Sequence, residues 1–146
     1  MERVHVEFPT EAILHRHALS VRITDMNYGR HLGHDSLISL LHEGRVAALS
    51  SLGLNEWDID GCPSVVADLA VQYQSEARWP DELIVETAIP APQGKALMVY
   101  HRMRRAQDER LVATARVSLL FIDPERGRPV VVPGSLRAAL AERGGD

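Results

Sequence analysis

Several features are scarce or missing in this sequence of 146 residues. Cys62 is the only cysteine, which excludes an internal disulfide and a metal site built from paired cysteines. No apolar run approaches the roughly 18–20 residues of a membrane-spanning helix. The N-terminus lacks the basic segment followed by an apolar block that marks a secretory signal. We therefore expect a protein of the reducing cytoplasm with no membrane partner.

Positive charge is also in deficit. The chain has 20 acidic and 16 basic residues and a formal net charge of −4. Proteins that neutralise nucleic-acid phosphates usually carry a basic excess, so we expect no nucleic-acid partner. The length suits one domain with a substantial buried core. We expect residues 1–146 to form a single domain whose core covers about 12–122.

Alternating and helical patterns fill most of the chain. Apolar and polar residues alternate over five segments, which is the period of β-strands. The last three are joined by short connections, which indicates antiparallel neighbours. A short helix is predicted near the C-terminus, at about 134–143. The predicted strands cover 12–23, 64–76, 82–90, 95–105 and 111–122.

The longest predicted helix covers residues 35–52. Its apolar side chains extend around much of the circumference, which predicts a buried helix. Asp35 or Ser36 stands where the N-cap belongs, and Gly53 stands where a left-handed C-terminal cap belongs. Gly44 lowers helix propensity by about 1 kcal/mol relative to alanine. We interpret it as a point of close approach to another backbone.

The order of these elements predicts an α+β fold. A sheet with one apolar face must bury that face against another element, and the helix at 35–52 is the only predicted element long enough to cover it. The expected architecture is the hot-dog fold, in which an antiparallel sheet of about five to six strands wraps around one long central helix.

One motif spans residues 21–45, and the residues that define it are Val21, Arg22, Asp25, His31, Glu43 and Arg45. This stretch resembles the hot-dog acyl-CoA thioesterases, in particular the branch similar to 4-hydroxybenzoyl-CoA thioesterase, and the similarity spans most of 12–122. The resemblance implies thioester hydrolysis without a cofactor or metal ion. It also implies a homodimer, with a tetramer as a dimer of dimers as the alternative, and a site between two protomers.

The resemblance places the family's catalytic acid at the position of Asn27. An amide has no useful basicity, but it can orient a water or donate to a developing oxyanion. In the related plant acyl-ACP thioesterases an asparagine and a histidine also contribute, and Gly29 and His31 occupy those positions here. The resemblance therefore implies that His31 remains as a catalytic group and that another residue acts as the base.

The loop 24–34 has catalytic character apart from any resemblance. It combines a carboxylate, an amide and two imidazoles, and it leads into a helix N-terminus, where N–H groups favour negative charge. An imidazole can take a proton from water near neutral pH. The predicted catalytic residues are Asp25, Asn27, His31, Asp35 and Glu43. The predicted substrate contacts are Tyr28, Gly29, Arg30, Gly33 and His34.

Three of these carboxylates have structural alternatives. Asp25 is also suited to cap the loop through backbone N–H groups, and Asp35 to cap the helix. Glu43 is expected in the middle of a buried helix, where an unpaired carboxylate is costly. It therefore either serves the site or pairs with an arginine or a histidine.

The predicted function is hydrolysis of an acyl-CoA or acyl-ACP thioester by water attack. Two alternatives stay open. One is a hot-dog enoyl-CoA hydratase or dehydratase, because Asp25-Met26-Asn27 resembles the start of that branch's motif. The other is a non-catalytic module that binds or senses acyl thioesters, because the family's acid is replaced by an amide.

Overall fold

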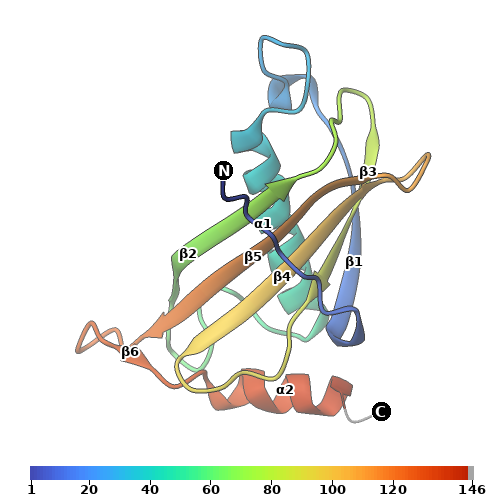
Figure 1. Cartoon of the computed structure of the whole chain (residues 1–146). Helices are drawn as coiled ribbons and strands as arrows, with labels where there is room; N and C mark the ends of the chain where they lie inside the picture. Colours follow the sequence, from blue (N-terminus) through green and yellow to red (C-terminus); the bar gives the residue numbers. More distant parts are fainter. Residues whose placement is uncertain (145–146) are drawn as a thin grey trace.

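A computed structural model describes residues 1–144 and has the predicted α+β architecture. All five predicted strands and both predicted helices are present, and a short sixth strand follows the fifth (Figure 1). The strands are β1 (Ile13–Ser20), β2 (Ser64–Tyr73), β3 (Glu82–Ala88), β4 (Ala96–Arg105), β5 (Leu111–Ile122) and β6 (Pro129–Val130). The helices are α1 (His34–Ser51) and α2 (Gly134–Gly144).

The strands form one antiparallel sheet. Their order is β1-β3-β4-β5-β2, and β6 pairs with the end of β5. Figure 1 shows α1 running across one face of this sheet, while α2 lies at one end of it. The N-terminal segment crosses the opposite face (Figure 1), where the Arg102 guanidinium lies 4.3 Å from the centre of the Phe8 ring. β2 is an edge strand, because β5 is its only neighbour in the described sheet.

Burial follows the predicted alternation on the central strands. Every second residue of β4, from Leu97 to Met103, is fully buried beneath α1 or beside it. α1 buries one face against the sheet and leaves part of its circumference exposed, including His42 and Glu43. The buried apolar residues of α1 are Leu37, Leu40, Leu41, Ala48 and Leu49.

The ends of α1 differ in how well they were predicted. The N-cap prediction was wrong, because the helix begins at His34 and Gly33 is its N-cap. The Gly33 N–H bonds the Asp25 carbonyl at 2.9 Å, and this contact starts the helix before Asp35 is reached. The C-terminal prediction is confirmed, since Gly53 is left-handed with φ +77°.

Gly44 marks a close approach, although the partner differs from the prediction. A Cβ atom at Gly44 would lie 2.6 Å from Cγ1 of Val85 and 3.2 Å from its Cβ. The close neighbour is therefore a side chain of β3 and not another backbone. The missing side chain lets α1 pack directly on the strand that runs beneath it. Within residues 1–144, no helix is both long and apolar enough to cross a membrane.

Candidate active site

A groove of about 380 Å³ lies at the N-terminal end of α1. One wall comes from the loop before α1 and from the first turn of the helix, and the other comes from the end of β2 and the residues that follow it. Three predicted site residues, Asn27, His31 and His34, are together in this groove. The other lining residues are Leu32, Leu37, Tyr73, Gln74, Ser75, Glu76, Ala77 and Val112.

A tight turn positions Asn27 and His31. The Asn27 N–H donates to the His31 carbonyl at 2.8 Å, and the Asn27 carbonyl accepts from the Arg30 N–H at 3.0 Å. Arg30 has φ +66°, which closes the turn. The side-chain oxygen of Asn27 accepts from the His31 N–H at 3.2 Å. Because that oxygen is engaged, the side-chain NH₂ of Asn27 is the group that can donate to a substrate.

His31 has a carboxylate partner that was not predicted from the sequence. Its Nε2 lies 2.9 Å from Oε2 of Glu76, a residue in the loop after β2. Sequence reasoning assigned this residue to the end of a strand, and no local motif marks it. Only the folded chain places Glu76 opposite the loop 24–34. The resemblance places the family's carboxylate at the position of Asn27. In this structure the carboxylate beside His31 is that of Glu76 instead.

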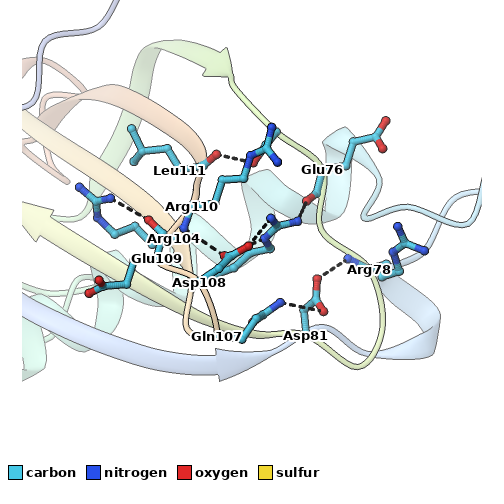
Figure 2. A network of polar contacts seen from close by, with 11 residues as sticks. Glu76, Arg78, Asp81, Arg104, Gln107, Asp108, Glu109, Arg110 and Leu111 are labelled. Atoms are coloured by element: carbon cyan, nitrogen blue, oxygen red, sulfur yellow. Dashed lines mark hydrogen bonds and ion pairs between the residues drawn. The ribbon is translucent and has the colours of Figure 1, made fainter.

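A network of polar contacts holds the backbone of the loop that carries Glu76 (Figure 2). Arg105 donates to the Glu76 carbonyl at 3.1 Å, and the Ser75 hydroxyl donates to the Leu111 carbonyl. Asp81 accepts the Arg78 N–H at 3.0 Å at the far end of the loop. Figure 2 shows the Glu76 carboxylate pointing away from this network. The backbone is therefore held while the carboxylate stays available to His31.

Asp25 is placed beneath the loop, outside the residues that line the groove. Its carboxylate accepts the Arg22 N–H at 2.8 Å and two bonds from the Arg22 guanidinium at 3.2 and 3.3 Å. Burial acts to raise the pKa of Asp25, but the bonds from Arg22 outweigh it and hold the pKa below its usual value. This geometry matches the loop-capping alternative for Asp25.

The other two predicted carboxylates lie in different surroundings. Asp35 is exposed in the first turn of α1, near the groove. Burial, reinforced by the charge of Asp35, raises the pKa of Tyr73 on the groove wall. Glu43 points toward β1, and its Oε2 lies 2.6 Å from Nε2 of His17. Glu43 does not line the groove, so the structure has it in the alternative role of pairing with a histidine.

The predicted substrate contacts include exposed side chains at the tip of the loop and a buried glycine at the start of α1. Tyr28 and Arg30 are exposed at the tip of the loop. Gly33 is buried, and a Cβ there would lie 2.7 Å from Oδ1 of Asp35, the end of an exposed side chain that can turn away. The first N–H groups of a helix have no carbonyl partner within it. In α1 these unpaired N–H groups begin with that of His34, a residue that lines the groove.

A buried ion pair lies farther along α1. Arg45 donates from Nε and Nη2 to Oε1 of Glu56 at 2.8 and 2.6 Å, and His42 Nε2 lies 3.1 Å from the other oxygen. Within residues 1–144, no group of three or more His, Cys, Asp or Glu side chains is placed to hold a metal ion.

The antiparallel sheet wrapped on one long helix is that of the hot-dog class. The chain belongs to the thioesterase-like superfamily, whose family model matches residues 21–140. No curated protein matches the sequence.

Solved structures share this fold at low identity. The 1,4-dihydroxy-2-naphthoyl-CoA thioesterase Slr0204 of Synechocystis has a TM-score of 0.81 at 16% identity, covering 87% of this chain and 95% of its own. The DHNA-CoA thioesterase of Staphylococcus aureus has a TM-score of 0.79 at 17% identity, with 89% and 90% covered. The candidate thioesterase PA2801 of Pseudomonas aeruginosa has a TM-score of 0.79 at 25% identity, with 88% and 99% covered.

Proposed function

We propose that this protein hydrolyses acyl thioesters of coenzyme A or of an acyl carrier protein, with His31 as general base and Glu76 as the group that orients it. The observation that carries the proposal is the 2.9 Å contact between Nε2 of His31 and Oε2 of Glu76 in a groove at a helix N-terminus. Membership of the thioesterase-like superfamily supports the reaction class.

The chemistry follows from the two ring nitrogens of His31. When Nε2–H donates to Glu76, Nδ1 keeps its lone pair and can accept a proton from water. The resulting hydroxide adds to the thioester carbonyl carbon and forms a tetrahedral intermediate. The C–S bond then breaks, and the proton held on Nδ1 passes to the departing thiolate sulfur. The products are the carboxylic acid and the free thiol.

The developing oxyanion needs donors in fixed positions. The unpaired N–H groups at the start of α1 lie on the groove wall, and the helix dipole there favours negative charge. The side-chain NH₂ of Asn27 is a second donor in the same groove. In this role an amide is more useful than a carboxylate, since a negative group would repel the oxyanion.

The proposed functional unit is a dimer with the site between two protomers. β2 is an edge strand with exposed apolar side chains at Val65, Val66, Leu69 and Tyr73. An edge of this kind is suited to pair with a second strand. Because the groove is lined by residues at the end of β2, a second copy paired along that strand would provide a further wall.

The test is release of free thiol from acyl-CoA and acyl-ACP substrates of graded length, followed with a thiol reagent. The His31→Gln variant should lose about 10²–10⁴-fold in kcat, the usual contribution of a general base. Glu76→Gln should lose less, because the amide oxygen can still accept from Nε2–H but carries no charge to stabilise the imidazolium. His5→Gln and Glu125→Gln, neither of which lines the groove, serve as matched controls and should keep wild-type rates. Full activity in His31→Gln would refute the assignment of the base.

Two further measurements separate the alternative functions. A hydratase would change the absorbance of an enoyl-CoA without releasing thiol. A sensing module would retain acyl-CoA tightly without product, and Asn27→Asp would then be expected to create turnover.

Light scattering tests the dimer, and Val65→Lys should dissociate it with loss of activity. A fully active monomer would overturn the two-protomer site.

A further inference from the structure

A second groove, of about 550 Å³, lies between α2 and the start of β1. Its walls come from residues 11–14, from residues 89–92 and from α2, and we call it the α2 groove. Figure 1 shows α2 at the end of the sheet opposite the loop that leads into α1. The α2 groove shares no lining residue with the candidate active-site groove, and none of its lining residues belongs to β2. It is therefore separate from both proposed sites.

The floor of the α2 groove is apolar. Leu14, Ile89 and Leu140 line it, and each is less than a tenth exposed. Ala91 and Ala141 are exposed members of the same lining. Sites for small molecules are typically concave, about 300–1,000 Å³ in volume, and lined by apolar side chains with a few polar groups. The α2 groove has a volume and a lining of this kind.

The backbone on two sides of the groove is irregular, which keeps the groove open. Residues 90 and 92 are prolines, and a segment with two residues that lack an N–H cannot extend β3 as a paired strand. On the other side, Ile13 pairs with Ala88 and His15 with Thr87, so Leu14 is an extra residue in the ladder. The bulge is where α2 contacts β1, through the Leu14 carbonyl.

Two arginines of α2 line the groove, and a backbone carbonyl holds each of them. Nη2 of Arg143 donates to the Leu14 carbonyl at 2.7 Å, and Nε of Arg137 donates to the Val132 carbonyl at 2.9 Å. A guanidinium has five N–H groups, so each arginine keeps donors that these bonds do not use. Within residues 1–144, neither guanidinium forms an ion pair with a carboxylate.

The charges of the lining define the head group that fits. Arg137, Arg143 and Glu11 are its charged residues, so two positive charges and one negative charge leave a single positive charge. A monoanion balances this charge, whereas a dianion such as a phosphate monoester would also be repelled by Glu11. A carboxylate is a monoanion that accepts strong, charge-assisted bonds from guanidinium N–H groups. The apolar floor suits an aliphatic chain attached to that carboxylate.

We propose that the α2 groove is a binding site for aliphatic carboxylates, with the head group on an arginine of α2 and the chain on Leu14, Ile89 and Leu140. A chain of medium length fits the space. At about 30 Å³ for each non-hydrogen atom, the share of volume of a liquid water molecule, octanoate with its roughly ten such atoms occupies about 300 Å³. The site does not depend on the proposed hydrolysis, because binding can be measured without turnover.

Calorimetry with octanoate as the probe tests the proposal. The full chain should bind one octanoate with a Kd of about 1 mM or tighter, a modest affinity for a ligand of this size. Octylammonium, which has the same chain and the opposite charge, should not bind. The double variant Arg137→Gln/Arg143→Gln should weaken octanoate binding at least about tenfold, the range of a hydrogen bond to a charged group. Absence of saturable octanoate binding, or equal binding of octylammonium, would overturn the proposal.

Further variants locate the bound octanoate. Ala141→Trp fills the groove from an exposed position, leaves both arginines in place and should abolish binding. Arg126→Gln removes an exposed arginine that does not line the groove and should keep the wild-type Kd. If His31→Gln abolishes binding and the double arginine variant does not, octanoate occupies the active-site groove and the proposal is wrong.

The result does not depend on any one variant folding. Circular dichroism checks each variant, and if the double arginine variant does not fold, Ala141→Trp and octylammonium still decide. Octanoate binding at α2 in a protein that releases no thiol from acyl-CoA would retain this inference and refute the hydrolytic function. Thiol release without octanoate binding would do the reverse.

Discussion

The contact between Gly44 and Val85 gives a stability prediction whose sign is opposite to helix propensity. In an exposed helix, Gly44→Ala would stabilise by about 1 kcal/mol. In this fold, however, the new Cβ would lie 2.6 Å from Cγ1 of Val85. Carbon atoms prefer a separation of about 3.5–4.0 Å, so the pair would be about 1 Å too close. Overpacking of this kind costs about 1–3 kcal/mol, and after the propensity gain of about 1 kcal/mol is subtracted we expect a net loss of up to about 2 kcal/mol.

Urea denaturation of four proteins tests this: wild type, Gly44→Ala, Val85→Ala and the double variant. Val85→Ala removes the methyl group that causes the clash, so Gly44→Ala in that background should be neutral or stabilising. The coupling free energy should equal the cost of the clash, about 1–3 kcal/mol, within the range for residues in contact. Ser50→Ala, at an exposed position of the same helix, controls for propensity alone. If Gly44→Ala stabilises the wild-type protein, the close packing of α1 on β3 is refuted.

Three further predictions concern buried polar groups. Because the pKa of His101 is about 3 in the folded protein and 6.5 in an unstructured peptide, stability should fall as the pH drops below 6.5. His101→Leu should remove about 2 kcal/mol of the wild-type loss between pH 8 and pH 5, at 1.36 kcal/mol per unit, and an unchanged profile would contradict this. Glu56→Ala leaves the buried Arg45 unpaired and should cost about 3–5 kcal/mol in urea denaturation, so a loss below 1 kcal/mol would show that Arg45 finds another partner. Asp25→Asn weakens the bonds from Arg22 and should cost about 1–3 kcal/mol at pH 7. The lowered pKa of Asp25 makes its contribution present at neutral pH and lost under acid, so the Asp25→Asn deficit should shrink by pH 3.

The strands and the central helix could be predicted because burial on one face imposes a period on the sequence. β4 shows this most clearly, since every second residue faces α1 and is apolar except for His101. β2 was also predicted as a strand, but its environment was not predictable. It is an edge strand, and Val65 and Val66 are exposed although they are as apolar as core residues. Periodicity identifies an apolar face but not the element that will cover it.

The start of α1 shows a different limit. Asp35 and Ser36 have strong capping propensity, yet the helix begins before them because the Gly33 N–H and the Asp25 carbonyl form a bond that fixes the entry of the chain. The contact with the preceding loop therefore determines where the helix starts, and the capping preference of Asp35 and Ser36 does not. The same loop places Asn27, His31 and His34 in one groove, because all three lie within a few residues of one helix end.

Glu76 and His101 were beyond sequence reasoning for a common physical reason. Each has its partner on another element: His31 for Glu76, and Thr87 for His101. The loop 24–34 carries the proposed base and the proposed amide donor, whereas the carboxylate proposed to orient that base comes from the loop after β2. Substitution of Glu76 should therefore act on turnover through the His31 imidazole, the proposed base, whereas His101 contributes to the pH dependence of stability.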